Sequence, residues 1–307
     1  MDAVIEVSAL RKAYGSVRAV DGVDLTLRRG EIVGVVGPNG AGKTTMLECV
    51  AGIRRPDSGV IRVLGLDPLH DRKQFTRRVS LQPQAGALFG NLTVRESVRL
   101  WCSFYPKPRD VDDLIAAVGL TEKADARVKR LSGGQYQRLR LVLALAGSCE
   151  ILLLDEPTGA LDPNAREDAW SAIRARGDEQ TVVVTTHSME EAEQLCDRVV
   201  IIDRGRVVAD GTPSALMDQH GGQTVSFRLP QPPDEAVLRR FPGVKAVLLR
   251  NHGGGALARL VTDDPARTSE KVRARYGATA KDVHVAPNSL HTVFVTLTGT
   301  ELKEVER

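Results

Sequence analysis

The residues best suited to chemistry follow a short apolar stretch. Ile32 to Val36 is apolar and rich in β-branched residues, which is typical of a strand buried on both faces. A helical pattern begins at Met46 to Val50, and between the two lies Gly37-Pro38-Asn39-Gly40-Ala41-Gly42-Lys43-Thr44-Thr45. In such a unit the glycines let backbone N–H groups surround a phosphate. Lys43 adds a charge near the β- and γ-phosphates, and the Thr44 hydroxyl can bind Mg²⁺. The stretch predicts a nucleoside triphosphate site.

Two further apolar runs end in side chains that can assist phosphate chemistry. Ile151 to Leu154 is followed by Asp155 and Glu156, and Thr181 to Thr186 is followed by His187. Because the carboxyl ends of parallel strands meet at one sheet edge, where ligands bind, these side chains are expected beside the phosphates. Asp155 would hold the Mg²⁺ shell, Glu156 would orient or deprotonate the attacking water, and His187 would contact the γ-phosphate.

A second glycine-rich stretch, Leu131-Ser132-Gly133-Gly134-Gln135, opens an apolar helix. Each glycine in the first turn of a helix costs about 1 kcal/mol relative to alanine. In return, the backbone N–H groups stay approachable at the end where the helix dipole favours an anion. The alternative is an ordinary cap, with Ser132 as the N-cap residue and the glycines merely tolerated. The stretch alone leaves both interpretations open.

The segments that must position these residues begin with strands. Val4 to Val7 and Val23 to Leu27 alternate apolar and polar residues, which predicts antiparallel strands. Tyr14 lies on a turn between them, where covering a strand edge is the ordinary role of an isolated tyrosine. Residues from about 86 to 147 form a predicted helical insertion, in which Thr93 and Glu96 have the spacing of a capping box.

Composition limits the class of protein. The chain has 307 residues, 42% of them hydrophobic and 26% charged, which describes an ordinary globular protein long enough for two domains. A net charge of +3 is too small to argue for nucleic acid. No apolar run approaches the roughly 20 residues that cross a bilayer, and no secretory signal is visible. The four cysteines lie far apart without metal or redox spacing, so buried free thiols in the cytosol are expected.

Residues 221–307 are expected to form a small α+β domain after a cassette of residues 1–220. The order β-α-β-β-α-β suggests a ferredoxin-like unit, with its elements at Thr224–Leu229, Asp234–Arg240, Val244–Leu249, Leu257–Val261, Ser269–Tyr276 and Asp282–Val285. Asn251 to Gly255 predicts the hairpin turn. A last helix, Ser289–Leu297, has one apolar stripe, which predicts packing in the core or, as the alternative, against a partner.

The complete ordered set of motifs resembles the nucleotide-binding subunits of ABC transporters over about residues 3–218. The matching segments are the phosphate loop at Gly37–Thr45, the LSGGQ signature at Leu131–Gln135, the acidic strand at Ile151–Glu156, the D-loop at Ala160–Asp162 and the switch histidine at His187. The signature pentapeptide is the most diagnostic of these. One departure is Gly159, where many members carry serine.

The resemblance implies an α/β P-loop NTPase fold of ABC type, with a mixed sheet core, an antiparallel β subdomain and a helical subdomain. It also implies ATP and Mg²⁺ as ligands, an adenine-stacking Tyr14, and Gln84 as the Q-loop glutamine, with Gln82 as the alternative. The implied nucleotide contacts are Tyr14, Gly37–Thr45, Ser132, Gly133, Gly134, Gln135 and Asp162; the catalytic residues are Lys43, Gln84, Glu156 and His187; and the metal contacts are Thr44, Gln84 and Asp155.

The resemblance extends to partners. In this family two subunits meet head to tail around ATP, so Ser132 and Gly134 would serve the nucleotide of a neighbouring copy. The tail, from Asn288-Ser289-Leu290 to Thr298-Gly299-Thr300-Glu301-Leu302, resembles the daunorubicin/doxorubicin drug-resistance exporter type, in which the permease is a separate chain. An exporter ATPase at the cytoplasmic face of the membrane is thus expected, moving a drug-like, lipid or other amphipathic compound. The alternative is a soluble ABC-type ATPase that acts on ribosomes or nucleic acid.

Overall fold

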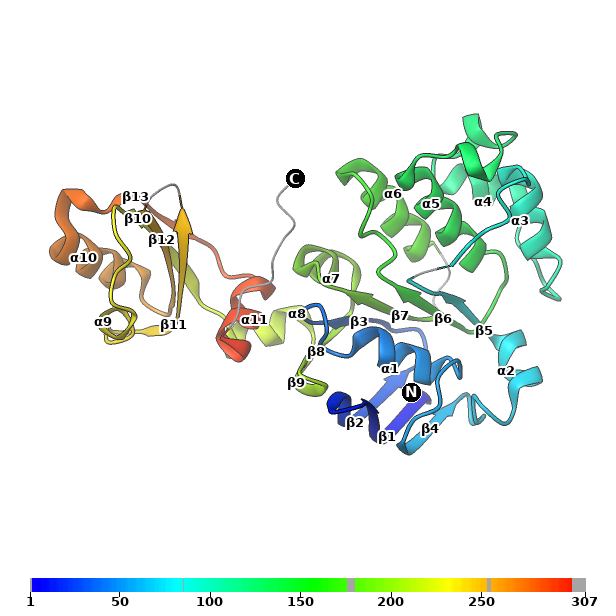
Figure 1. Ribbon diagram of the computed structural model, residues 1–307, viewed down its shortest axis with the longest axis horizontal. Helices are drawn as coiled ribbons and strands as arrows, with labels where there is room; N and C mark the ends of the chain where they lie inside the picture. The colour runs from blue at the N-terminus through cyan, green and yellow to red at the C-terminus, as the bar shows by residue number, and fades with distance from the viewer. Residues whose placement is uncertain (1, 85, 176–179, 253–254, 300–307) are drawn as a thin grey trace. The chain divides into compact units, whose positions relative to one another are not determined.

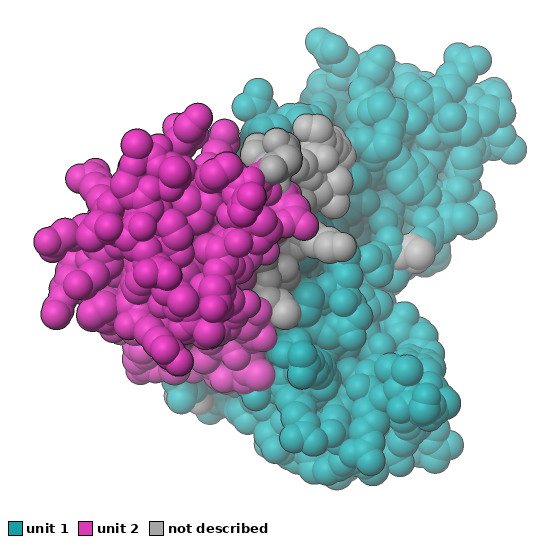
Figure 2. All heavy atoms as spheres, turned by 60° about the vertical axis from the view of Figure 1, so that its left-hand side comes forward, with its two compact units in different colours: residues 1–207 teal, residues 208–307 magenta. Residues whose placement is uncertain are grey.

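The computed structural model describes residues 2–84, 86–175, 180–252 and 255–299. The chain forms two compact units, residues 1–207 and residues 208–307 (Figures 1 and 2). Each is a separate packing unit. The division falls before residue 220 because the helix α8 (Pro213–His220) packs against the last helix of the second unit.

The first unit is built on a six-stranded sheet with the strand order β5-β6-β7-β3-β8-β9. The strands are β3 (Ile32–Val36), β5 (Val79–Gln82), β6 (Ile151–Asp155), β7 (Thr181–Thr186), β8 (Arg198–Asp203) and β9 (Arg206–Gly211). The pairs β5–β6, β6–β7, β7–β3 and β3–β8 are parallel. Every residue of β3, β6 and β7 is buried, as their apolar runs predict. Parallel pairing brings the carboxyl ends of these three strands to one edge.

A three-stranded antiparallel sheet, in the order β2-β1-β4, completes the β part of this unit. Its strands are β1 (Ala3–Tyr14), β2 (Val17–Arg28) and β4 (Ser58–Val63). β1 and β2 are longer than their alternating segments predict, because the hairpin pairing continues to Tyr14 and Val17 despite several bulges. Helix α1 (Lys43–Val50) shares one hydrophobic core with both sheets.

The helical part of the first unit lies mainly between β5 and β6 in the chain. Its helices are α2 (Arg72–Arg78), α3 (Val94–Cys102), α4 (Val111–Ala117) and α5 (Gly133–Ala144), with 3-10 turns at Thr121–Lys123 and Val128–Arg130; α6 (Pro163–Arg174) and α7 (Met189–Leu195) follow β6 and β7. The capping box of Thr93 and Glu96 is confirmed at the start of α3. Helix α2 was not predicted, because Phe75 is its only buried residue and no apolar period marks it.

The second unit contains a four-stranded antiparallel sheet in the order β11-β12-β10-β13. Its elements after α8 are β10 (Gln223–Leu229), α9 (Glu235–Leu238), β11 (Val244–His252), β12 (Gly255–Thr262), α10 (Pro265–Tyr276), a 3-10 turn at Gly277–Thr279, β13 (Lys281–Ala286) and α11 (Leu290–Thr298). Phe227 and Leu260 on one face of the sheet pack with Leu238 of α9 and Val272 of α10. The predicted hairpin pairing of β11 with β12 is confirmed, while its turn at residues 253–254 lies outside the described residues.

The apolar stripe of the last helix is part of the core of the second unit. Leu290, Val293 and Phe294 are fully buried, and α11 packs against α8. The Asn288 side chain, just before α11, accepts a hydrogen bond from the Gly222 backbone and donates one to the Met217 carbonyl. These two hydrogen bonds join the end of α8 and the residue before β10 to the start of α11 within the second unit. The tail residues 300–302 of the sequence resemblance lie outside the described residues.

The cysteines and the helix lengths bear on the expectations from composition. All four cysteines are buried and free, as expected: Cys49, Cys102, Cys149 and Cys196. Among the residues that the structure describes, no helix is both long and apolar enough to span a membrane.

Candidate nucleotide site

The loop between β3 and α1 has a backbone that only glycine permits at two positions. Gly42 has a φ of 102°, and a Cβ there would lie 2.0 Å from the carbonyl oxygen of Ala19. A Cβ on Gly37 would lie 2.2 Å from the carbonyl oxygen of Ile202. The two glycines therefore let the loop approach the neighbouring backbone while its own N–H groups stay open to a ligand.

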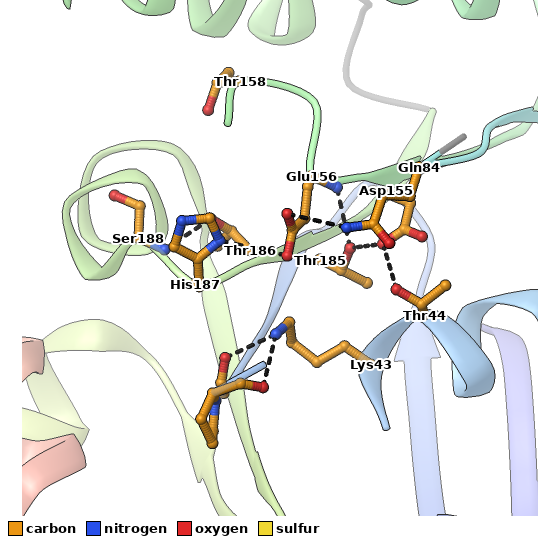
Figure 3. A network of polar contacts seen from close by, with 12 residues as sticks. Lys43, Thr44, Gln84, Asp155, Glu156, Thr158, Thr185, Thr186, His187 and Ser188 are labelled. Carbon is orange, nitrogen blue, oxygen red and sulfur yellow. Dashed lines mark hydrogen bonds and ion pairs between the residues drawn. The ribbon is translucent and has the colours of Figure 1, made fainter. Parts of the chain in front are cut away.

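Lys43 is folded into this loop. Its side chain is buried, and Nζ donates hydrogen bonds to the carbonyl oxygens of Gly37 at 2.7 Å and Pro38 at 3.1 Å (Figure 3). Burial lowers the pKa of the ammonium group, while the negative charges of Glu156 and Asp155 oppose the shift. When a phosphate binds, this ammonium group can replace a hydrogen bond to a neutral carbonyl oxygen with a stronger one to a charged phosphate oxygen.

Asp155, at the end of β6, has its carboxylate against two hydroxyl groups. Thr44 donates to Oδ1 at 3.2 Å, and Thr185 of β7 donates to the same oxygen (Figure 3). Burial raises the pKa of Asp155, and these two hydrogen bonds oppose the rise. The Thr44 hydroxyl and the Asp155 carboxylate thus face one point, and oxygen donors of this kind suit Mg²⁺. The donor set fits the metal that the phosphate loop requires.

Glu156 occupies a strained backbone position directly after β6. Its φ is 47°, in the left-handed region that a residue with a side chain rarely adopts, which costs on the order of 1–3 kcal/mol. Its N–H donates to the Thr185 carbonyl at 3.0 Å and also approaches the Thr185 hydroxyl at 3.2 Å. This geometry turns the carboxylate away from the sheet and into the polar cluster of Figure 3.

The carboxylate of Glu156 has a basic neighbour on one side and an amide on the other. His187 Nδ1 lies 3.3 Å from Oε1, and Gln84 Nε2 donates to Oε2 at 3.3 Å. The His187 contact is the main cause that lowers the pKa of Glu156, and the same contact raises the pKa of His187. Glu156 is therefore an ionised carboxylate at neutral pH, able to accept a proton from a water held beside it.

The two glutamines that the sequence could not separate have different surroundings. Gln84 is exposed, touches Glu156 and lines the nucleotide pocket. Gln82 is the last residue of β5 and is buried, and neither side-chain amide atom has a hydrogen-bond partner among the residues that the structure describes. The Gln84 carbonyl is also held by Arg140 Nη1 of α5 at 2.9 Å. The structure thus places Gln84, and not Gln82, among the polar groups of the site.

These groups border an open pocket of about 470 Å³. Tyr14 stands at its rim, 43% exposed, with the guanidinium carbon of Arg54 5.2 Å from its ring centre. Ala19 also lines the pocket and was not predicted from the sequence. Its backbone carbonyl is the group that lies against Gly42, and a backbone group gives no pattern of residue types. The lining residues are Tyr14, Ala19, Asn39, Gly40, Ala41, Gly42, Lys43, Thr44, Thr45, Gln84 and Glu156.

The signature stretch does not line this pocket. Ser132 caps α5 by accepting a hydrogen bond from the Gln135 N–H, and Gln135 completes a capping box. Ser132 and Gly133 are exposed, and Asp162 is an exposed N-cap of α6. A Cβ on Gly133 would meet nothing within 4 Å, and one on Gly134 would lie 3.7 Å from its nearest neighbour. Nothing within the described part of the chain therefore requires glycine at these positions.

Two buried polar residues near the site carry no motif and were missed. Gln137 of α5 donates from Nε2 to the carbonyl oxygens of Glu156 at 3.2 Å and Pro157 at 2.9 Å. Glu191 of α7 is 1% exposed and accepts hydrogen bonds from Thr158 and Trp170. The only signal for Gln137 is a polar residue within an apolar helix. For Glu191 there is none, since the neighbouring glutamates at positions 190 and 193 look the same in sequence.

Comparison with known proteins agrees with this geometry. A family model described as ABC transporter matches residues 20–159. The "Nod factor export ATP-binding protein I" of Rhizobium sp. (strain N33) is 37% identical over 98% of both chains. The protein of the same name from Paraburkholderia xenovorans (strain LB400) is 37% identical over 99% of both.

Solved structures match the fold over about two thirds of the chain. One described as "Structure of ATP binding subunit of ABC transporter" has a TM-score of 0.64 at 26% identity, over 70% of this chain and 92% of its own. A dimeric post-hydrolysis state of the ATP-binding cassette MJ0796, bound to ADP and Pi, has a TM-score of 0.62 at 27% identity, over 68% of this chain and 98% of its own. The expected P-loop fold of ABC type is confirmed. The chain belongs to the ABC transporter family, as an ATP-binding subunit whose ATPase activity is coupled to transport.

Proposed function

We propose that this chain energises export through a separate permease, by hydrolysing MgATP at the Thr44–Asp155–Glu156–His187 cluster. The main support for this proposal is that side chains from α1, from the end of β6 and from the end of β7 converge beside one pocket. Export is supported by the name of relatives that match nearly the full chain, "Nod factor export ATP-binding protein I". The same matches give no support to the alternative, a soluble ATPase acting on ribosomes or nucleic acid.

The proposed chemistry follows from the position of each group. The loop N–H groups and Lys43 bind the β- and γ-phosphates, while Thr44 and Asp155, with Gln84 nearby, hold Mg²⁺. Bound Mg²⁺ neutralises phosphate charge as the terminal phosphate leaves. Glu156 accepts a proton from the attacking water, and His187 contacts the γ-phosphate. Tyr14 stacks on the adenine from the rim of the pocket.

The signature glycines support a two-subunit site. Gly133 and Gly134 leave the start of α5 bare although nothing in the described part of the chain requires it. In the proposed head-to-tail homodimer, Ser132, Gly133, Gly134 and Gln135 of one copy close on the nucleotide of the other, with Asp162 at the same interface. The matching MJ0796 cassette is a dimer, which is consistent with such an assembly.

The transported compound belongs to the same proposal. The drug-resistance type suggested by the tail is a finer assignment than the family, and the relatives named above carry Nod factor export in their names. We propose an amphipathic compound, drug-like or lipid, moved by a permease to which this subunit attaches at the cytoplasmic face. The strand order of the second unit supports a ferredoxin-like accessory domain over residues 221–307.

The direct test is Glu156→Gln, which keeps the shape of the side chain and removes the base. We expect MgATP binding to persist, steady-state turnover to fall by about 10²-fold or more, and a dimer to accumulate with ATP. Turnover is measured by phosphate release, and the dimer by size-exclusion chromatography with light scattering. Glu190→Gln, an exposed glutamate on α7, is the matched control and should behave as wild type. Full turnover in Glu156→Gln would show that another group is the base.

A further inference from the structure

One buried carboxylate near the site takes no part in the chemistry above. Glu191 lies on the first turn of α7 and is 1% exposed. Its Oε1 accepts a hydrogen bond from Thr158 Oγ1 at 2.7 Å and one from Trp170 Nε1 at 3.1 Å. Two donors, one from the loop after β6 and one from α6, therefore converge on one side-chain oxygen.

The burial of Glu191 makes its hydrogen-bond partners important. Burial raises the pKa of Glu191, and the hydrogen bonds from Thr186, Thr158 and Trp170 oppose the rise. Arg166, the basic residue whose charge acts on it, makes its own ion pair with the exposed Glu190 at 3.3 Å. A buried carboxylate whose neighbours are neutral donors depends on all of them, because a lost hydrogen bond leaves it poorly solvated.

The segments that Glu191 joins are the two that carry the proposed base and sensor. Thr158 follows Glu156 by two residues and begins the turn that leads to Asp162. On the other side, Thr186 immediately precedes His187, and its hydroxyl accepts a hydrogen bond from the Ser188 N–H at 2.9 Å. Ser188 in turn caps α7 by accepting the Glu191 N–H at 3.2 Å. The path from Thr158 to the residues on either side of His187 is continuous.

The same loop is held from its opposite end by the signature helix. Gln137 of α5 donates to the Glu156 and Pro157 carbonyls. The strained φ of Glu156 persists only if its surroundings over-determine it. Gln137 and Glu191 contact residues 156–158 from two sides, and each belongs to a neighbouring helix. Both helices therefore contact the loop that carries the Glu156 carboxylate.

We propose that Glu191 is a positioning residue that couples the loop after Glu156 to the segment carrying His187, so that base and sensor are set together. The inference rests on the roles proposed for Glu156 and His187. Through Thr158, the loop that approaches a second subunit is tied to the position of the histidine. Through Trp170, the same carboxylate is anchored on α6, whose N-cap is Asp162. Binding of a second subunit at the D-loop, Ala160–Asp162, would therefore change the positions of Glu156 and His187 together.

The decisive variant is Thr158→Val, which removes one hydroxyl and keeps the shape. In the full-length chain we expect kcat for MgATP to fall about ten- to a hundredfold, as for a slightly misplaced catalytic group, with the Kd for MgATP changed by less than about threefold because no nucleotide contact is lost. Glu191→Gln should lower kcat in the same direction. Glu191→Gln keeps an acceptor oxygen and changes the charge of the group, so the double variant should lose less than the sum of the two single changes, because both act on the Thr158–Glu191 contact.

A second readout comes from Trp170 itself. The chain contains two tryptophans, so a Trp101→Phe background leaves Trp170 as the only indole. Its emission should respond to MgATP in this background and should stop responding when Thr158→Val is added. Glu190→Gln, the exposed neighbour of Glu191, is the control in both assays and should leave kcat within about twofold of wild type.

The outcomes separate the coupling from the proposed function. A kcat for Thr158→Val that stays close to the wild-type value, or Trp170 emission that ignores MgATP, overturns the coupling. So does a parallel loss of kcat, MgATP affinity and melting temperature, which is the signature of a structural role. Glu156→Gln is run alongside: if it keeps its turnover, the base assignment fails whatever Glu191 does. If it loses turnover while Thr158→Val does not, only the coupling fails.

Discussion

Two carboxylates that are neighbours in the chain, Asp155 and Glu156, have opposite pKa shifts. The Asp155 carboxylate is enclosed by neutral hydroxyl groups, so burial dominates and raises its pKa. Glu156 has His187 beside it, and that contact lowers its pKa. Neighbouring acids with divergent pKa values are typical of sites that divide two roles between them. Here the division agrees with a metal-holding Asp155 and a proton-accepting Glu156.

The His187–Glu156 pair predicts a pH-dependent stability. The pKa of His187 is raised above its ordinary 6.5, so its contribution is full below pH 6.5 and is lost as the pH rises through the raised value. The pKa of Glu156 is lowered below 4.5, so its contribution is full above pH 4.5 and is lost as the pH falls through the lowered value. The pair is therefore complete between about pH 4.5 and 6.5.

The measurement is urea unfolding of the wild type and His187→Ala at a series of pH values from about 5.5 upward. At about pH 5.5 the free energy of unfolding of the wild type should exceed that of His187→Ala by no more than about 1 kcal/mol, since both groups are partly exposed. The difference should diminish as the pH rises through the raised pKa of His187. If the free energies of unfolding of the two proteins differ by the same amount at every pH, His187 stabilises the chain by packing alone.

At the scale of elements, helix α5 connects the two faces of the proposed mechanism. Its start carries the exposed signature, and one turn later Gln137 holds the loop after Glu156. Arg140, a further turn along, holds the Gln84 carbonyl. One rigid helix thus contacts the backbone on both sides of the pocket, which gives it the means to pass movement between a partner subunit and the catalytic groups.

The two signature glycines predict a separation of stability from activity. Gly134→Ala adds a methyl group that lies at an ordinary contact distance, 3.7 Å, and alanine favours a helix by about 1 kcal/mol. The variant should unfold at slightly higher urea concentration and yet lose most of its turnover, because the methyl group would obstruct the nucleotide of the other copy. Turnover equal to that of the wild type would contradict a role for this glycine in the dimer. Gly42→Ala, which clashes within its own chain, should lose stability as well.

At the scale of the whole molecule, the two units have separate cores, and the described pocket belongs to the first. Strand β9 contains the boundary at Val207 and Val208. The solved cassettes named above match about two thirds of this chain over nearly all of their own length. We therefore propose that nucleotide binding is a property of the first unit, and we expect the second unit to serve assembly or regulation.

Truncation tests this separation. A chain ending at Thr212 keeps β9 and should bind MgATP within about threefold of the full-length affinity, since no pocket contact is removed. A chain ending at Val207 loses most of an edge strand and should be less stable by thermal melting. Binding is measured by isothermal titration calorimetry. A large loss of MgATP affinity in the chain that ends at Thr212 would show that the second unit supports the pocket.

The local motifs were predictable because they depend on neighbouring residues. The phosphate loop, the Asp155–Glu156 pair and His187 each follow a short buried strand, and strand order in a parallel sheet brings such ends together. The cap at Ser132 and the box at Thr93 were equally local. Helix α2 was missed because its residues are mostly charged and its single buried phenylalanine gives no period.

What the sequence determined by itself was therefore the chemistry: a phosphate loop, an acidic strand end, a histidine and a bare helix start, in an order that indicates one family. The tertiary structure decided which groups meet. It placed Gln84 beside Glu156, brought Gln137 and Glu191 to the same loop, and buried the stripe of α11. Such contacts join residues far apart in the chain, and a buried glutamate is identical in sequence to an exposed one until the fold gives each its neighbours.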